Sequence, residues 1–186
     1  MVRFEPDPGP TPDADLIDVM RRGNVEAFEE LYARHRDWVF HLAFRFTGNR
    51  EDALDVLQET FAYLLKQMPR LQLYAKLTTY IYPVVKNLAM TVHRKKGRTV
   101  SDDTVPEQAA PAETPDADQS RQELTAVFAG LPVEHREVLL MRFVDDMRLE
   151  EIADALAIPI GTVKSRLHNA LAKLRRDPRL RRYFER

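Results

Sequence analysis

Between residues 97 and 120 the chain loses the apolar side chains that a folded core requires. This stretch carries three prolines and six acidic residues, and Arg98 is its only base. Low hydrophobicity together with excess like charge favours an extended, disordered segment. We therefore expect a flexible acidic linker over 98–119, which divides the chain into two parts that must each build a core.

On both sides of this linker, apolar residues recur at the spacing of an α-helix, and no alternating strand pattern competes with them. The repeat begins at Leu16 and resumes after the linker at Leu124. The sequence therefore predicts an all-α protein with two small helical domains, over 15–97 and 120–186. Prolines at 6, 8, 10 and 12 precede them, so residues 1–14 are expected to be a disordered tail.

Several residues mark where individual helices begin and end. Gly48 is typical of a helix stop, and Asn49 is a good N-cap because its amide oxygen accepts a free backbone N–H. The helix that follows should end before Pro69. A further helix is expected over 78–95. The apolar face of the helix after Asn49 is predicted to consist of Leu54, Leu57, Phe61 and Leu64.

The composition excludes several classes of protein. The chain has 186 residues, a net charge of -1 and no cysteine, which rules out disulfides, thiolate zinc sites and a cysteine nucleophile. No apolar run approaches a membrane span and no secretory signal is recognisable, so we expect a cytoplasmic protein without membrane contact. The five histidines lack metal-ligand spacing and no phosphate-binding glycine loop is present. We expect neither a cofactor nor a metal, and no catalysis.

The stretch "LEEIADALAIPIGTVKSRLHNALAKLR", residues 149–175, predicts two short helices around a tight turn. Pro159 suits the beginning of the second helix, where a missing N–H costs nothing. The first helix has one apolar stripe, formed by Leu149, Ile152, Ala153 and Leu156. In the second helix, the apolar face consists of Val163, Leu167, Ala170, Leu171 and Leu174. This is the pattern of a helix-turn-helix.

The opposite face of the second helix carries small, polar and cationic side chains, which a helix needs in order to enter the major groove of DNA. Thr162, near the helix N-terminus, and Arg166, on the flank, are placed to contact phosphate. An ordinary solvated face is the alternative, but a run of arginines beyond residue 172 favours DNA. The predicted DNA contacts are Thr162, Lys164, Ser165, Arg166, His168 and Asn169.

A second polar constellation lies in the first domain. Asp55, Gln58 and Glu59 stand at positions i, i+3 and i+4 of one helix, so they form an acidic strip opposite the apolar face. No matching metal or nucleophile pattern accompanies them, which argues against catalysis. A solvated face and a docking surface for a basic or polar partner both remain possible meanings.

The predicted helix over 78–95 combines aromatic rings with bases. Aromatics beside cations are typical of single-stranded DNA binding, because bases stack on rings while Lys and Arg hold the backbone. Core packing of Tyr82 and a basic helix end are the alternative explanation. The candidate strand-binding residues are Tyr80, Lys86, Asn87, Arg94, Lys95 and Lys96.

Two long motifs in the correct order carry a resemblance to a known family. "DALDVLQETF" at 52–61 and the stretch from "LPVEHREVLLMR" at 131–142 through "GTVKSRL" at 161–167 resemble the extracytoplasmic-function sigma factors of bacterial RNA polymerase. The likeness extends over about residues 15–176. It implies a sigma region 2 domain and a sigma region 4 helix-turn-helix domain.

The resemblance also implies what each surface binds. Asp55, Gln58 and Glu59 would dock on the core polymerase. The helix predicted over 78–95, with its tyrosines and basic residues, would bind the melted minus-ten element. Asn87 would belong to a pocket for a flipped base, whose extrusion helps to melt the duplex. The helix-turn-helix would read the minus-thirty-five element. The linker would thread into the polymerase, and an anti-sigma factor is an expected partner.

This chain departs from the family pattern at three places. The segment "RLQLYAKL" at 70–77 lacks the glycine-containing "FRG" that many members have before the next helix, so a differently shaped base-reading loop is expected. Tyr80-Ile81-Tyr82-Pro83 stands where a Trp-Leu pair is usual, and a proline inside a helix removes a hydrogen bond and tends to kink it. Asn169 replaces a common arginine, which should weaken phosphate attraction or change the preferred base. The rival functions are a repressor or activator that binds DNA without polymerase, and an interaction protein that occupies polymerase or an anti-sigma partner without starting transcription.

Overall fold

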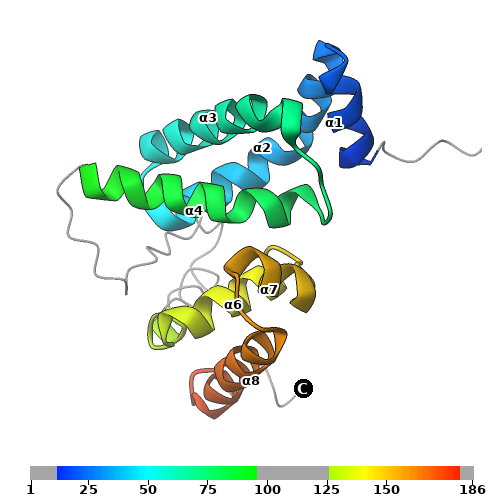
Figure 1. Cartoon of the computed structure of the whole chain (residues 1–186). Coiled ribbons are helices and arrows are strands. Elements are labelled where there is room, and N and C mark those ends of the chain that lie inside the picture. Colours follow the sequence, from blue (N-terminus) through cyan, green and yellow to red (C-terminus); the bar gives the residue numbers. More distant parts are fainter. Residues whose placement is uncertain (1–11, 96–125, 181–186) are drawn as a thin grey trace, which may run out of the picture.

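The computed structural model describes residues 12–95 and 126–180, and all regular structure in these two ranges is helical (Figure 1). The N-terminal unit runs from α1 to α4 and the C-terminal unit runs from residue 126 through α8. Residues 1–11 of the tail predicted over 1–14, the linker over 98–119 and the candidate site residue Lys96 lie outside the described ranges. The helices of the N-terminal unit are α1 (Asp13–Arg21), α2 (Val25–Thr47), α3 (Arg50–Gln67), the short 3₁₀ helix η1 (Met68–Arg70) and α4 (Leu77–Lys95).

The helix ends follow local capping chemistry. Gly48 ends α2 in the left-handed conformation at φ 62°, which only glycine adopts without strain. The Asn49 side chain then accepts a hydrogen bond from the Asp52 N–H at 3.1 Å and begins α3, as predicted. α3 ends at Gln67, before Pro69, also as predicted. α4 is assigned as one helix through Pro83, whose missing N–H leaves the Thr79 carbonyl without its helical donor.

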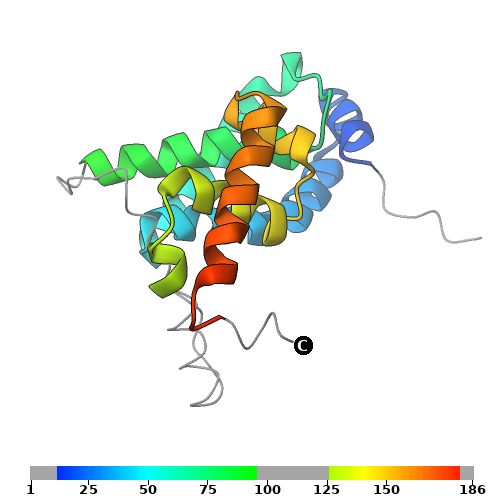
Figure 2. The same ribbon diagram turned by 90° about the horizontal axis from the view of Figure 1, so that it is seen from below.

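The C-terminal unit consists of a helical turn at 126–129 followed by three helices: α6 (Val133–Phe143), α7 (Leu149–Leu156) and α8 (Ile160–Arg176). α7 and α8 form the predicted helix-turn-helix, with Pro159 as the residue before α8. The turn between them depends on Ala157, which lies in the left-handed region at φ 52°. Seen from below, α8 lies across α6 and α7, on the side away from α4 (Figure 2).

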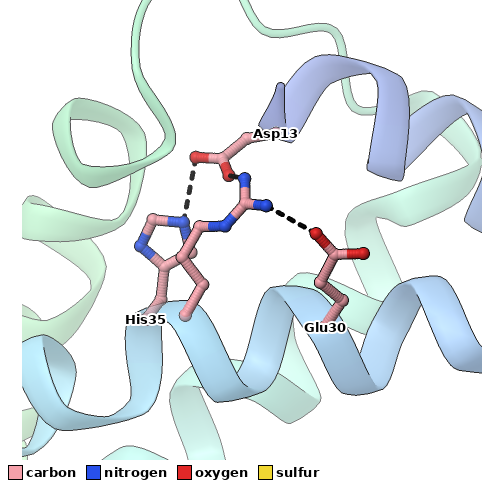
Figure 3. Close-up of polar contacts among 4 residues, drawn as sticks. Asp13, Glu30 and His35 are labelled. Carbon is pink, nitrogen blue, oxygen red and sulfur yellow. Dashed lines mark hydrogen bonds and ion pairs between the residues drawn. The ribbon is translucent and has the colours of Figure 1, made fainter. Parts of the chain in front are cut away.

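A polar cluster ties α1 to the middle of α2 (Figure 3). The Asp13 carboxylate lies 2.9 Å from Nε2 of His35 and accepts a hydrogen bond from Nη1 of Arg34 at 2.8 Å. Arg34 also donates to Glu30 at 2.6 Å. Below this cluster Leu16 and Ile17 are buried in the core. α1 therefore begins at Asp13, two residues before the helical segment predicted from the sequence.

One cluster of buried apolar side chains is continuous through both units. It joins Tyr82 and Val85 of α4 with Val138 and Met141 of α6. A smaller cluster within the C-terminal unit surrounds Ala170. α4 packs against α7, and in Figure 1 it lies between the α2–α3 pair and the C-terminal unit.

Two large apolar side chains lie at the surface, and one of them, Leu54, was predicted to lie on the apolar face of its helix. Leu54 is 38% exposed, and the core face of α3 is formed instead by Ala53, Val56 and Thr60 with Leu57 and Phe61. Phe143, at the end of α6, is 62% exposed. Helical spacing identifies an apolar stripe, but its edge is set by the neighbouring helix that covers it.

Candidate functional site

The acidic strip of α3 faces solvent. Asp55, Gln58 and Glu59 are all exposed, while Val56 and Leu57 beside them are buried. None of the three strip residues forms a side-chain hydrogen bond or ion pair with residues 12–95 or 126–180. Their carboxylate and amide groups are therefore available to a partner outside the chain.

A groove of about 450 Å³ runs beside this strip, between α3 and α4. The three strip residues form one wall, and Leu88, Val92 and Lys95 of α4 contribute to the other. Leu88 and Val92 are only half-buried. The site thus combines an acidic edge with an apolar floor, which suits a helical partner with basic and apolar side chains.

A second groove, of about 530 Å³, opens where the loop before α4 meets α3 and α4. Three tyrosines are among the residues that line it: Tyr63 comes from α3, Tyr74 from the loop and Tyr80 from α4. Asn87 is exposed at its rim, one helical turn beyond Pro83. We call this the tyrosine groove. Stacking rings beside an amide that both donates and accepts hydrogen bonds suit an unpaired base.

The tyrosines of this groove differ in their surroundings. Tyr74 is 92% exposed, whereas Tyr63 is 36% exposed. Partial burial, together with the neighbouring Tyr63 hydroxyl, raises the pKa of Tyr80 to about 12. Tyr80 is uncharged at neutral pH, as a tyrosine with the ordinary pKa would also be, so its ring does not repel a phosphate backbone.

The candidate cations of α4 divide into two groups. Arg94 and Lys95 are exposed at the end of the helix, where they favour an anionic ligand. Lys86 is half-buried, and its Nζ donates to Oε1 of Glu137 in the C-terminal unit at 2.6 Å. Tyr82 is 1% exposed, so it packs in the core and its ring is not available for stacking.

The second helix of the helix-turn-helix has two distinct faces. Val163, Ala170 and Leu174 are buried against α6 and α7. On the outer face, the exposed side chains are Lys164, Ser165, His168 and Asn169, while Thr162 and Arg166 are half-buried at the flanks. All six residues predicted to contact DNA thus lie on one helix, and four of them form a continuous exposed face.

The C-terminal end of α8 is anchored to its own unit. Lys173 donates a hydrogen bond to the Gly130 carbonyl. Leu180 is 3% exposed and packs in the smaller cluster with Leu131 and Leu139. This anchoring fixes α8 and directs its polar face outward, as a groove-reading helix requires.

Sequence reasoning missed Tyr63 and Tyr74 as members of the tyrosine groove. Tyr74 lies in the short stretch 71–76 between two helical patterns, and an aromatic residue in such a loop is a sign of a binding site that could have identified it. Tyr63 follows the acidic strip on α3, and only the packing of α3 beside α4 brings it close to Tyr80. No such local signal was present for Tyr63.

Within the described residues no helix is long and apolar enough to cross a membrane. The same part of the chain contains no group of three or more histidine or acidic side chains placed to hold a metal ion. The chemistry of the three surfaces is that of binding: an acidic strip, an aromatic groove and a cationic helix face.

A helix-turn-helix with an outward polar face, joined to a helical unit with an aromatic groove, defines a DNA-binding transcription protein. Comparison with known families makes this class specific. Residues 31–99 match Sigma-70 region 2, and residues 127–176 match Sigma-70 region 4.

Similarity to individual relatives extends beyond these two regions. The chain is 31% identical over 179 residues to the ECF RNA polymerase sigma factor SigE of Mycolicibacterium smegmatis, covering 92% of this chain and 69% of that protein. It is 26% identical over 177 residues to the ECF RNA polymerase sigma factor SigW of Bacillus subtilis, covering 88% and 95%.

Two solved structures share the fold. CnrH, solved in complex with the cytosolic domain of CnrY, has a TM-score of 0.64 and 21% identity, covering 87% of this chain and 93% of that one. The sigma factor RpoE of Bartonella quintana, solved with the anti-sigma factor NepR, has a TM-score of 0.62 and 21% identity, covering 81% and 96%. The chain belongs to the ECF sigma factors of the sigma-70 family, which initiate transcription by RNA polymerase.

Proposed function

We propose that each of the three surfaces binds a different partner during transcription initiation. The α3 strip binds core polymerase, the tyrosine groove and the α4 cations bind the melted minus-ten strand, and α8 reads the minus-thirty-five element. The observation that carries this proposal is the exposed polar face of α8, held outward by the buried Val163, Ala170 and Leu174.

At the minus-thirty-five element, Lys164 and Arg166 attract the phosphate backbone, which supplies affinity without sequence preference. Ser165, His168 and Asn169 lie on the exposed face of α8 and carry both hydrogen-bond donors and acceptors, with which they read base edges. Thr162, close to the first free N–H groups of α8, contacts a phosphate at the helix N-terminus. Three residues therefore specify the sequence and three position the helix.

At the minus-ten element, one flipped base enters the tyrosine groove. Tyr74 and Tyr80 stack on it, and Asn87 hydrogen-bonds its edge. Arg94 and Lys95 hold the phosphates of the same strand, together with Lys86 when this side chain is free. A stacked base cannot return to its partner, so its capture stabilises the melted duplex.

On the polymerase, Asp55, Gln58 and Glu59 pair with a basic, polar surface of the largest subunit, and the apolar floor formed by Leu88 and Val92 receives its side chains. Exposure of the strip and its lack of partners among residues 12–95 and 126–180 support this assignment. Because two rim charges are involved, docking should weaken as salt concentration rises.

The partners follow from the same surfaces: core polymerase, promoter DNA and a protein antagonist of the anti-sigma class, the kind of partner that NepR is for RpoE of Bartonella quintana. We propose that the protein acts in the cytoplasm as a regulatory subunit without catalytic activity of its own. The genes whose transcription it initiates belong to a stress-responsive or signal-dependent regulon, as in the family it belongs to.

The test is run-off transcription with bacterial core polymerase on a genomic promoter library. Asp55→Arg/Glu59→Arg should abolish the transcripts that wild type produces from a shared upstream sequence. The matched control is Glu29→Arg/Asp37→Arg, which makes the same charge change at exposed positions of α2. Equal transcription by the strip variant would refute the docking role. Binding of duplex DNA without any transcript from wild type would refute the sigma activity and indicate a repressor or activator.

A further inference from the structure

The contact between the two units contains a nearly buried, bidentate ion pair. Nη1 and Nη2 of Arg45 in α2 donate to the two carboxylate oxygens of Asp145, at 2.9 and 2.7 Å. The two side chains are only 12% and 3% exposed. Asp145 lies in the loop between α6 and α7, one hundred residues from Arg45 in the chain. Because it joins α2 to the loop between α6 and α7, this pair orients one unit against the other.

A second carboxylate of the C-terminal unit crosses the same boundary. Oε1 of Glu137 accepts hydrogen bonds from the Tyr82 hydroxyl at 3.1 Å and from Nζ of Lys86 at 2.6 Å. Glu137 is 8% exposed. Burial, with the negative Glu137 beside it, raises the pKa of Tyr82 well above its usual value, so its hydroxyl remains a donor. Both hydrogen bonds of Glu137 therefore reach across to α4.

A third contact lies at the mouth of the tyrosine groove. Nζ of Lys76 lies 3.4 Å from Oε1 of Glu151 in α7. Burial alone would raise the pKa of Glu151, but hydrogen bonds from Arg148 and the charge of Lys76 hold it below its usual value. Asp154, one turn further along α7, forms part of the wall of the groove itself. α7 thus places negative charge at the groove, where it would repel the phosphates of a nucleic-acid strand.

These contacts conflict with strand binding. Lys86 is paired with Glu137, Lys76 is paired with Glu151, and Asp154 adds a carboxylate to the lining of the groove that contains Asn87 and Tyr80. A phosphate approaching the edge of the site at Lys76 and Lys86 would meet carboxylates already paired with these lysines, and at a few ångströms the repulsion between like charges is substantial. Tyr74, Asn87 and the outer face of α8 remain exposed, so the C-terminal unit obstructs one edge of the melted-strand site and leaves the surface of α8 open.

Buried ion pairs are well suited to a contact that must open. Removing the charges from water costs about as much as their attraction returns, so the pairs add orientation with little net stability. On opening, each charged group regains hydration. Continuous apolar packing between Tyr82, Val85, Val138 and Met141 supplies the remaining adhesion.

We propose that this contact is an autoinhibitory latch, in which the carboxylates of Glu137, Asp145 and Glu151 hold the C-terminal unit against one edge of the melted-strand site until polymerase and promoter separate the units. The proposal rests on the proposed function in assigning that site to DNA. The latch predicts that removing its carboxylates opens the free protein and lets it engage polymerase and promoter at lower concentration.

The experiment compares Glu137→Gln/Asp145→Asn with Glu134→Gln/Asp146→Asn. Both variants replace one carboxylate of α6 and one of the following loop by its isosteric amide, and the Asp146 side chain is 97% exposed. Because the chain has no cysteine, Asp37→Cys and Arg175→Cys provide unique positions for a dye pair on the two units. Energy transfer then reports their separation, and circular dichroism checks the helix content.

The latch variant should lose energy transfer, with the ratio of closed to open protein falling at least fivefold, while the control matches wild type. A charge reversal tests the same point: Asp145→Arg should open the protein, and adding Arg45→Asp should close it again. Unchanged transfer in both latch variants, with helix content intact, would overturn the proposal.

Transcription by unlabelled protein with core polymerase tests inhibition separately. The concentration of sigma factor that gives half-maximal run-off product should fall at least threefold for the latch variant and stay unchanged for the control. Opening without this fall would overturn the inhibitory role. If wild type and latch variant both fail to transcribe, the proposed function is refuted and inhibition with it, while energy transfer still decides whether these carboxylates hold the units together.

Discussion

Nε2 of His35 lies 2.9 Å from the carboxylate of Asp13, and this contact fastens the first residue of α1 to the middle of α2 (Figure 3). Arg34 shares the same carboxylate through a hydrogen bond of 2.8 Å. Asp13 and His35 lie on two consecutive helices, α1 and α2, which are separated by a short turn. Asp13 is therefore both the start of a helix and an anchor for it.

The anchor makes the stability of the N-terminal unit depend on pH. Burial would raise the pKa of Asp13, but His35 and Arg34 outweigh it and hold the pKa below 3.8. A carboxylate with a lowered pKa in the folded state adds stability that is complete above the unfolded value and is lost as pH falls through the folded value. Asp13→Asn should thus lower the free energy of unfolding by about 1–2 kcal/mol at pH 7.

Urea denaturation at several pH values measures this effect. The difference between wild type and Asp13→Asn should shrink below about pH 4, because protonation removes the same charge from wild type. Asp18→Asn is the control on the same helix. Its carboxylate is 59% exposed in a surface pair with Arg21, so its loss should cost less than about 0.5 kcal/mol. A constant difference at all pH values would contradict this account.

The turn of the helix-turn-helix stores strain at Ala157, whose φ of 52° lies in the left-handed region. An L-residue with a Cβ pays about 1–2 kcal/mol there, whereas glycine loses only about 0.5–1 kcal/mol in extra chain entropy. Ala157→Gly should therefore stabilise the protein by about 0.5–1 kcal/mol. Thermal unfolding checks this, and Ala172→Gly within α8 should destabilise by about 1 kcal/mol.

Substitution of Gly161 should change stability and promoter binding in opposite directions. A Cβ built at this position meets nothing within 4 Å, and the residue is exposed in the first turn of α8. Gly161→Ala should raise the free energy of unfolding by about 0.5 kcal/mol, because the unfolded chain has fewer conformations to lose. On a promoter fragment the added methyl should weaken binding by holding α8 away from the groove. Undiminished promoter affinity would place the DNA on another face.

Asn169 sits on the exposed face of α8 among the residues assigned to the minus-thirty-five element. Asn169→Arg adds a cation there, so holoenzyme should bind duplex promoter severalfold more tightly at low salt. The logarithmic dependence of affinity on salt concentration should steepen by about one unit, as expected for one more phosphate contact. Asn169→Gln, which lengthens the side chain without charge, should leave that slope unchanged.

Tyr74 tests the tyrosine groove with little risk to the fold. Its ring is 92% exposed, so Tyr74→Ala should change the free energy of unfolding by less than about 0.5 kcal/mol. Loss of a base-stacking ring should cost about 1–3 kcal/mol in binding the melted strand, and permanganate footprinting should show roughly fivefold less open promoter. Tyr74→Phe keeps the ring and should retain melting. A normal footprint from the alanine variant would exclude this loop from the strand site.

Local chemistry was readable directly from the sequence. Gly48 and Asn49 mark the boundary between α2 and α3, and Pro159 marks the start of α8, because caps depend only on neighbouring backbone groups. The outward face of α8 followed from residue spacing, since one helix with an apolar stripe must turn its other side to solvent. The same reasoning found the strip at Asp55 and Glu59.

Contacts between helices were decided only by the tertiary structure. Spacing could not tell that Leu54 would be exposed, that Tyr63 would meet Tyr80, or that Lys86 would pair with Glu137 across the unit boundary. These facts depend on which faces of distant segments meet, and the sequence positions of two residues say nothing about that. The sequence by itself thus determined the helices and their surface chemistry, while packing determined which of those charges are free to bind and which are held within the chain.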